Sequence, residues 1–219
     1  MTRRSLLSTL LVLLALPAFA FAAGGWAIIT VDDLPEYLVA DQPTEISFTV
    51  RQHGMGLLSG LAPSVEAKSG GKKATVNAVP GKGSGRYTAQ LSLPQPGEWT
   101  ITIRSGFGPV HSTLLPIQAI ARGAATPAPA LAADRGARLF VAKGCVGCHL
   151  HGMIDRPQIV AVGPELTARK YPAEFLAKRL ADPSSVQGAG SQMPNLGLRQ
   201  EEIQALIAFI NSDPAPSRK

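Results

Sequence analysis

The five residues Cys145-Val146-Gly147-Cys148-His149 place two thiols and an imidazole at a spacing that suits one particular chemistry. In the c-type attachment pattern, Cys-x-x-Cys-His, the thiols add to the two vinyl groups of a haem, and the adjacent imidazole is held under the iron as an axial ligand. A thioredoxin-like dithiol would need a βαβ setting, and a zinc site would need two further ligands. The surrounding sequence supplies neither, so the motif predicts one covalently bound haem c.

A second axial ligand must come from elsewhere in the chain. Met193 lies 44 residues after His149, in a loop before an apolar helical segment, and is the best candidate. A Met/His pair raises the reduction potential of a haem relative to other axial pairs. The alternative is that Met193 packs in the core, as most methionines do. The other donors are either too near the motif or in a different region: His53, His111, His151 and Met153.

The first 22 residues have the pattern of a secretory signal peptide. Arg3 and Arg4 precede an apolar run, and Ala-x-Ala sites follow at residues 18–20 and 20–22. We expect cleavage after Ala22 and a periplasmic mature protein. The alternative is an uncleaved membrane anchor, because residues 5–23 are nearly long enough to span a bilayer.

The composition is typical of a globular chain with many turns. The 219 residues are 45% hydrophobic and 16% charged, with 22 glycines and 18 prolines, which disfavours both a coiled coil and a disordered chain. The formal net charge of +6 is scattered along the sequence and aromatic residues make up only 5%. A nucleic-acid-binding surface is therefore not expected.

Residues 23–121 form the first predicted domain, an all-β sandwich of immunoglobulin-like size. Short runs rich in Val, Ile and Thr alternate there with turn residues. The expected strands are residues 27–31, 45–52, 64–67, 73–79, 86–93, 98–104 and 113–119, about the number in an immunoglobulin-like fold. Because no disulfide can join the sheets, four large residues are expected to supply the packing: Phe48, Tyr87, Leu91 and Trp99.

This region resembles the small periplasmic β-sandwich domains called YtkA-like or FixH-like. The resemblance lies in residues 48–54, Phe-Thr-Val-Arg-Gln-His-Gly, and in the stretch from Gly85 to Trp99. These are mainly turn and core residues, so the resemblance implies a fold more than an activity.

An Ala/Pro-rich linker, residues 122–133, separates the sandwich from a helical domain, residues 134–212, which precedes a short tail, residues 213–219. Three helices are expected: one capped by Asp134 and ending near Lys143, one from Pro172 to Ala181 with an apolar stripe of Phe175, Leu176 and Leu180, and one over about residues 200–211. Three short helices make a thin core. A bound group is expected to fill it.

The helical domain resembles a class I cytochrome c domain, an all-α fold with a single haem. In that family a glycine and an aromatic residue of the first helix cross the last helix. Gly136 and Phe140 match those positions, opposite Leu206 and Phe209.

The segment Gly163-Pro164-Glu165-Leu166 resembles the family loop in which a proline carbonyl accepts the second ring N–H of the axial histidine. The resemblance therefore implies that Pro164 orients His149 and that Leu166 packs on the haem. Judged without the resemblance, Gly163-Pro164 is equally consistent with an ordinary turn.

One departure from the family concerns the last helix. Arg199 stands where the family commonly has a capping Ser, Thr or Asp, so we expect no side-chain cap at that end. Glu201 and Glu202 in the first turn partly compensate through the helix dipole. No role is predicted for Arg199 itself.

These features predict a multidomain protein: an all-β immunoglobulin-like sandwich followed by an all-α cytochrome c fold. It is expected to transfer single electrons between redox partner proteins, with the sandwich as a docking module. We expect an electron-transfer protein and not an enzyme. The alternative is a subunit of an oxidoreductase complex. Lys143, Arg169 and Lys170 are candidates for a basic ring around the haem edge. A membrane contact is expected only if the N-terminal segment is an uncleaved anchor.

Two other functions are kept as alternatives. In the first, Met193 is a labile ligand and the protein is a gas sensor or a peroxidase. In the second, the haem is structural and the sandwich handles copper for oxidase assembly through His53 and Met55, because imidazole and thioether suit Cu(I). Two donors at the end of a strand do not complete a metal site, and Met55 can instead pack beneath Leu57 and Leu58.

Overall fold

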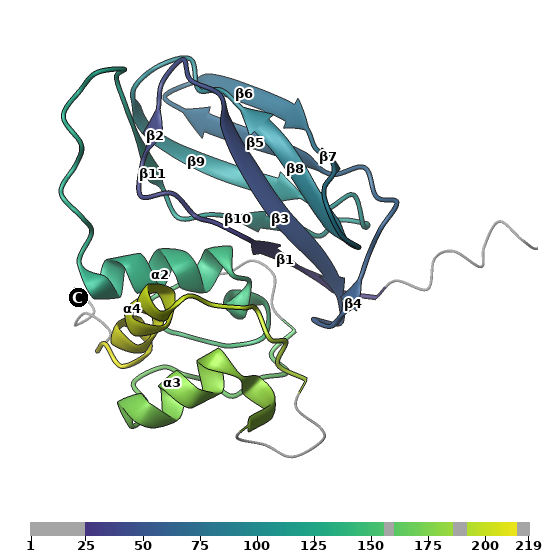
Figure 1. The fold of residues 1–219 in the computed structure, drawn as a ribbon, viewed down its shortest axis with the longest axis vertical. Coiled ribbons are helices and arrows are strands. Elements are labelled where there is room, and N and C mark those ends of the chain that lie inside the picture. Colours follow the sequence, from purple (N-terminus) through teal and green to yellow (C-terminus); the bar gives the residue numbers. More distant parts are fainter. Residues whose placement is uncertain (1–24, 156–159, 186–191, 214–219) are drawn as a thin grey trace, which may run out of the picture.

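A computed structural model of the chain describes residues 25–155, 160–185 and 192–213. They form a two-sheet sandwich followed by a group of three helices, joined by an extended segment (Figure 1). The predicted signal segment, residues 1–22, lies outside this part of the chain, as do residues 214–219 of the tail. No helix in the described ranges is both long and apolar enough to cross a membrane.

The first sheet of the sandwich is antiparallel, with the strand order β1-β3-β8-β7, and β4 pairs with the end of β3. β1 is therefore an edge strand whose free side is available for packing against another part of the chain. The strands are β1 (Ala27–Val31), β3 (Thr44–Gln52), β4 (Gly56–Leu57), β7 (Val79–Pro80) and β8 (Arg86–Leu91).

The second sheet has the order β2-β11-β9-β5-β6, and β10 pairs with β9. Only the β2–β11 pair is parallel. The strands are β2 (Leu38–Val39), β5 (Ser64–Ser69), β6 (Lys72–Asn77), β9 (Gly97–Arg104), β10 (His111–Thr113) and β11 (Ile117–Ile120). The predicted strand over residues 113–119 is divided in two, because Pro116 has no N–H to give to a ladder.

The core between the sheets contains the four large residues expected there. Phe48, Tyr87, Leu91 and Trp99 are each at most 2% exposed. The rings of Phe48 and Tyr87 stack with their centroids 5.9 Å apart. Each such side chain stabilises the fold by about 1.5–3 kcal/mol relative to leaving it in water, so the sandwich holds together without a disulfide.

One surface carboxylate of the sandwich has two cationic partners. Glu66 on β5 lies 2.8 Å from the Nζ of Lys68 and 2.5 Å from the Nζ of Lys73 on the neighbouring β6. Hydrogen bonds from Lys68 and then Lys73 lower the pKa of Glu66 to about 2.

The helical region contains α2 (Ala132–Ala142), α3 (Ala173–Ala181) and α4 (Gln200–Ile210), with short 3₁₀ turns η2 (Cys145–Gly147) and η3 (Pro183–Ser185). α2 begins three residues earlier than predicted, with Leu131 at the N-cap position and no side-chain cap, so Asp134 is not its cap. Asp134 lies instead in the first turn, where the helix dipole favours a negative charge.

The apolar stripe of α3 is narrower than predicted. Leu176 and Leu180 are buried, but Phe175 is 41% exposed. The Phe175 ring stacks on Tyr171, with the ring centroids 6.0 Å apart. Phe175 therefore belongs to an aromatic pair at the surface and not to the helix core.

α2 and α4 cross at a point where only glycine fits. A Cβ on Gly136 would lie 2.0 Å from the carbonyl oxygen of Ala205 and 2.6 Å from the Cβ of Phe209. Phe140, one turn later on α2, packs on the Phe209 ring with a centroid separation of 5.3 Å. Gly136 and Phe140 thus occupy the helix crossing as expected.

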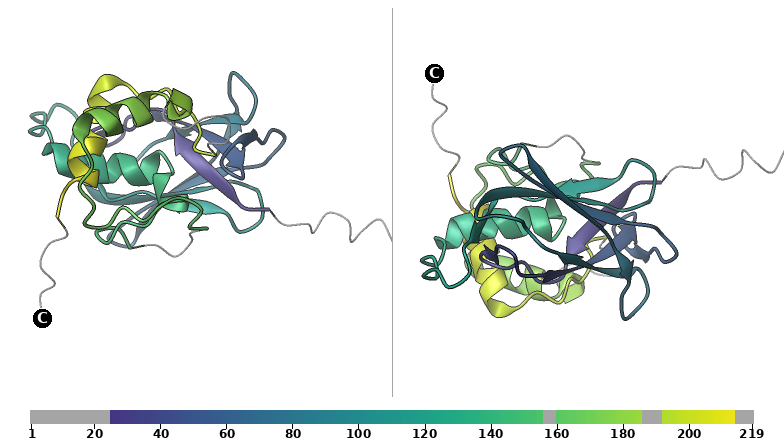
Figure 2. Two further views of the ribbon diagram at one scale, coloured as in Figure 1. Left: turned by 90° about the horizontal axis from the view of Figure 1, so that it is seen from below. Right: turned by 90° about the horizontal axis from the view of Figure 1, so that it is seen from above.

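The helices lie along the β1 edge of the sandwich, as both Figure 1 and Figure 2 show. The segment from residue 121 to residue 131 contains no helix or strand and is largely exposed. It leads from β11 to α2 in a wide arc (Figure 1).

Candidate functional site

A cavity of about 550 Å³ surrounds the Cys-x-x-Cys-His motif. Its volume lies in the usual range for small-molecule and cofactor sites. Cys145, Cys148 and His149 line it, and so does Met193. A second cavity, of about 660 Å³, lies between the linker and the sandwich, and none of its described lining residues is a cysteine, histidine or methionine. The smaller cavity therefore holds the candidate chemistry.

The motif sits on a tight turn directly after α2. Gly144 has a φ of +78°, in the left-handed region that favours glycine, and it ends the helix so that η2 can begin at Cys145. The backbone N–H of His149 donates to the carbonyl of Cys145 at 2.9 Å. Neither cysteine forms a disulfide.

A second segment, residues 160–166, is bonded along the motif and fixes its position. The backbone N–H of Gly163 donates to the carbonyl of Cys148 at 3.0 Å, and that of Val160 donates to the carbonyl of Gly147 at 3.0 Å. Just beyond the motif, the N–H of Leu166 donates to the carbonyl of Leu150 at 2.7 Å. These bonds bring Pro164 and Leu166 next to the motif.

The His149 ring is oriented by this second segment. Its Nδ1 lies 2.9 Å from the carbonyl oxygen of Pro164. A carbonyl can only accept, so Nδ1 carries the proton, and the lone pair of the neutral ring lies on Nε2, the atom able to bind a metal. A Cβ on Gly163 would lie 2.4 Å from the Cε1 of His149. Gly163 therefore leaves the space that the ring occupies.

Both thiols are kept in their neutral form. Burial raises the pKa of Cys145 to about 12, and burial also raises the pKa of Cys148. Dithiol redox catalysis uses the thiolate, which a reactive site stabilises by lowering the thiol pKa. The surroundings of Cys145 and Cys148 instead raise the thiol pKa.

The other sulfur and imidazole groups near the motif lie in different settings. Met193 is partly buried and lines the cavity. Met153 is 43% exposed and its sulfur accepts a hydrogen bond from the hydroxyl of Ser212 at 3.3 Å. His151 is only 1% exposed and its ring packs on Phe209 with the centroids 4.2 Å apart. Of these three residues, Met193 alone lines the cavity.

The donor set and the cavity walls fit a haem. Two thiols lie at the attachment spacing, and the imidazole is protonated on the nitrogen that faces Pro164. Met193 offers a thioether on the same cavity, and haem iron is commonly held by such a His/Met pair. Apolar side chains complete the lining: Phe140, Leu166, Leu176, Leu180 and Ile210.

The basic ring predicted around the haem edge is wrong for Lys143. This side chain is 4% exposed and its Nζ lies 2.9 Å from the carboxylate of Glu202, which is 3% exposed. Arg169 and Lys170 are exposed, and Lys170 pairs with Asp213 at 2.7 Å. Lys143 was expected at the surface because lysine is almost never fully buried unless it is paired.

Arg199 has a role that the sequence did not suggest. Its side chain has no acceptor and does not cap α4, as expected, but its Nη2 reaches Asp33 of the sandwich at 2.9 Å. Glu202 accepts a hydrogen bond from the backbone N–H of Arg199 at 3.0 Å and so satisfies one of the donors at the helix start. Glu202 thus acts through direct contacts as well as through the helix dipole.

Two residues of the sandwich, Ile28 and Thr30 on β1, also line the cavity and were missed from sequence. The signal was present in the run Ala-Ile-Ile-Thr-Val, residues 27–31. A half-buried strand alternates between apolar and polar residues, but in β1 all residues from Ile28 to Val31 are buried. A run of this kind indicates a strand covered on both faces.

The candidate copper donors, His53 and Met55, lie in the turn that follows β3. His53 is exposed in a left-handed conformation with a φ of +51°, and its ring lies 5.6 Å from that of Trp26. Met55 is 50% exposed and Leu57 46% exposed, so the expectation that Met55 packs beneath Leu57 is wrong. The described residues contain no group of three or more His, Cys, Asp or Glu placed to hold a metal ion.

Comparison with known proteins supports the assignment of the helical region. Residues 131–210 match the family model described as cytochrome C oxidase, cbb3-type, subunit III. A search of curated proteins gives no significant match.

Solved structures similar to this chain include two β domains. One is the Lin-41 filamin domain, with 18% identity and a TM-score of 0.37, covering 45% of this chain and 98% of that one. Another is the CARDB domain of the PF1109 protein from Pyrococcus furiosus in complex with di-metal ions, with 14% identity and a TM-score of 0.28, covering 45% of this chain and 90% of that one.

The match covers the three helices, the motif and the loop that contacts it. The fold, the cavity and the family model agree over this region. The C-terminal region of the chain is therefore a cytochrome c domain, a kind of domain that uses bound haem for electron transfer, and it follows an all-β immunoglobulin-like domain.

Proposed function

We propose that this protein is an exported electron carrier with one haem c, attached through Cys145 and Cys148 and ligated by His149 and Met193. The observation that carries this proposal is the 2.9 Å contact between the Nδ1 of His149 and the Pro164 carbonyl, beside a cavity that Met193 also lines. When bound, the haem supplies a one-electron iron couple that is reduced by one partner and oxidised by another. The chain supplies attachment, orientation and a shielded site.

His149 and Met193 have separate tasks in this proposal. The Pro164 carbonyl fixes the tautomer and the plane of the His149 ring and makes its Nε2 a stronger donor. The Met193 thioether favours ferrous iron and raises the potential. With both ligands in place no position at the iron is open to oxygen or peroxide, which suits a carrier and not a sensor or a peroxidase.

We place the protein in the periplasm, on the strength of the signal-like segment at residues 1–22. Its proposed partners are redox proteins, and an oxidase is the class that the description of the matched family names. The sandwich is the proposed docking module. Its strands β6, β7 and β8 lie on the side away from the helices, where a partner has access (Figure 1).

The test is an absorption spectrum of the full chain produced with a c-type maturation system. We expect a haem that stays with the protein in acidified organic solvent, and a sulfur-to-iron charge-transfer band in the oxidised form. Met193→Ala should remove this band, whereas Met153→Ala, which changes the exposed methionine, should leave it in place. A colourless protein, or a band that survives in Met193→Ala, contradicts the proposal.

Carbon monoxide separates the carrier from the gas-sensing and peroxidase alternatives. The reduced protein at neutral pH should not bind it, because both axial positions are filled. Met193→Ala should bind it readily. Tight binding by the unmodified protein would show that Met193 is labile or absent from the iron and would favour a sensor.

A further inference from the structure

We propose that strand β1 of the sandwich is a wall of the haem cavity, and that Ile28 is a positioning residue that keeps water from the attachment turn and so raises the reduction potential. This inference rests on the proposed function, since it concerns the same haem. It gives the sandwich a task in the redox centre itself, beyond docking a partner.

The first observation is the close approach of Ile28 to the turn that carries Cys145. A Cβ on Gly144 would lie 2.3 Å from the Cγ2 of Ile28 and 2.8 Å from the carbonyl oxygen of Ile29. A Cβ on Gly147, between the two cysteines, would lie 3.2 Å from the Cγ1 of Ile28. Gly144 and Gly147, one before and one after Cys145 in the attachment turn, thus leave the space that Ile28 fills.

The second observation is that Ile28 faces the cavity beside the helical region and is not part of the hydrophobic core cluster. The side chains of Ile29 and Val31 belong to the main hydrophobic core, whereas Ile28 lines the cavity together with Thr30. Ile28 is 8% exposed and Thr30 is 4% exposed. Alternate residues of one strand therefore serve two different interiors.

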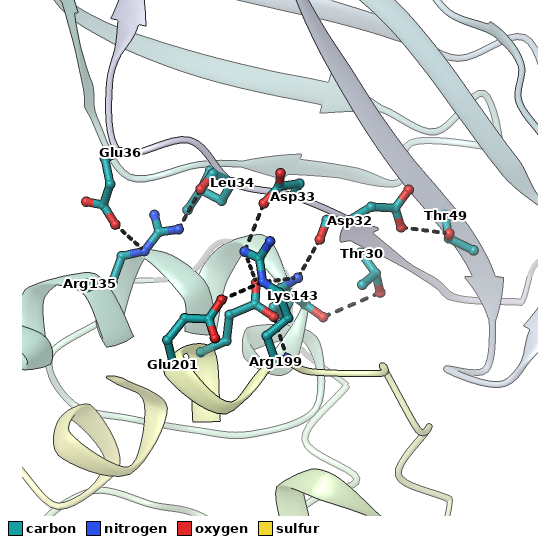
Figure 3. Close-up of polar contacts among 11 residues, drawn as sticks. Thr30, Asp32, Asp33, Leu34, Glu36, Thr49, Arg135, Lys143, Arg199 and Glu201 are labelled. Carbon is teal, nitrogen blue, oxygen red and sulfur yellow. Dashed lines mark hydrogen bonds and ion pairs between the residues drawn. The ribbon is translucent and has the colours of Figure 1, made fainter. Parts of the chain in front are cut away.

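The third observation is a set of polar contacts that fixes β1 on the turn (Figure 3). The hydroxyl of Thr30 donates to the carbonyl of Lys143 at 3.4 Å, and the Nζ of Lys143 donates to the carbonyl of Asp32 at 2.7 Å. Lys143 also holds Glu202 of α4 at 2.9 Å. One buried lysine thereby joins β1, the end of α2 and the start of α4.

Two further arginines join the domains around this lysine (Figure 3). Arg135 of α2 pairs with Glu36 at 2.7 Å and donates to the carbonyl of Leu34 at 2.5 Å. Arg199 pairs with Asp33 at 2.9 Å. All of these acceptors lie in the segment that follows β1, so the wall is held along its length and not at one point.

The wall has a consequence for the potential. Ferric haem carries one more positive charge than ferrous haem, and water stabilises the more highly charged form. A site that excludes water therefore favours the reduced form, because the apolar shell around a metal controls its dielectric environment. Admitting water or a hydroxyl at Ile28 should lower the midpoint potential.

Two variants of equal shape test this in the full-length, haem-loaded protein. Ile28→Val removes one methyl group, and Ile28→Thr has the same shape as the valine variant with a hydroxyl in place of one methyl. In a redox titration we expect Ile28→Thr to have a lower midpoint potential than Ile28→Val. The midpoint potential of Ile28→Val should equal that of the unmodified protein or lie slightly below it. Ile46→Val is the matched control, since Ile46 is 2% exposed in the sandwich core and does not line the cavity.

The outcomes separate this inference from the proposed function. If Ile28→Thr has the potential of the unmodified protein while retaining its haem and its charge-transfer band, β1 is not a functional wall and the inference is overturned. If Ile46→Val lowers the potential as much as Ile28→Thr, the effect is a general one of the sandwich and the inference is again overturned. If the unmodified protein binds no haem, the proposed function itself fails.

Discussion

Replacing Lys143 by methionine should destabilise the folded protein more than any surface change. Lys143 and Glu202 are 4% and 3% exposed, and their charged atoms lie 2.9 Å apart. Removing one member of a buried pair leaves the other charge without compensation and typically costs about 3–5 kcal/mol. Glu202 keeps two contacts with Arg199, at 3.0 Å and 3.3 Å, so we expect a loss near the lower end, about 3 kcal/mol.

The measurement is guanidinium chloride unfolding followed by the far-ultraviolet circular dichroism of the helices. With a denaturant slope of about 4 kcal/mol per molar, a loss of about 3 kcal/mol moves the midpoint down by about 0.75 M. The slope itself should not change, because the same surface is exposed on unfolding.

The control is the double variant Lys143→Met with Glu202→Gln. Glutamine keeps an acceptor for the backbone N–H of Arg199 but carries no charge, so the double variant should recover at least half of the lost stability. A loss below about 1 kcal/mol in Lys143→Met is the size expected for an exposed salt bridge and would refute the reasoning. A double variant no more stable than the single one would do the same.

Three other changes have defined outcomes. Gly136→Ala should cost about 1–3 kcal/mol or more in unfolding free energy, because its Cβ would lie 2.0 Å from the Ala205 carbonyl oxygen; normal stability would show that the helices separate easily. Gly163→Ala should displace the His149 ring and alter the absorption spectrum, and an unchanged spectrum would argue against that ring as ligand. Glu66→Gln should be less stable than the unmodified protein above pH 4.5, because folding lowers the pKa of Glu66 from 4.5 to about 2. The difference in unfolding free energy should shrink as the pH falls towards 2. A difference that stays constant from pH 7 to pH 2 would contradict this.

Local patterns were sufficient to predict the elements that hold the motif. The apolar period of residues 203–210 predicted α4, and Pro172 with Asp182 bounded α3, since capping and breaking signals depend on neighbours in sequence. The contact of Pro164 with His149 was expected from the family resemblance and not from the residues alone, because a Gly-Pro pair by itself is an ordinary turn.

The interface between the domains was not predictable in the same way. Lys143 binds a carbonyl 111 residues earlier in the chain, and Arg199 binds a carboxylate 166 residues earlier. No local pattern encodes such a pairing, and charged residues are placed on the surface by default. One available indication was the adjacent pair Ile28 and Ile29, which departs from the apolar–polar alternation of a half-buried strand.

The linker sets how firmly the two domains are held together. Its ten residues from 122 to 131 contain alternating alanine and proline, and an extended chain of that kind spans about 31 Å at ~3.1 Å per residue. Two bodies tethered over such a span meet at an effective concentration in the millimolar range. The polar contacts around Lys143 therefore need only a modest intrinsic affinity to keep the domains associated, and cutting the chain within the linker would make that association depend on protein concentration.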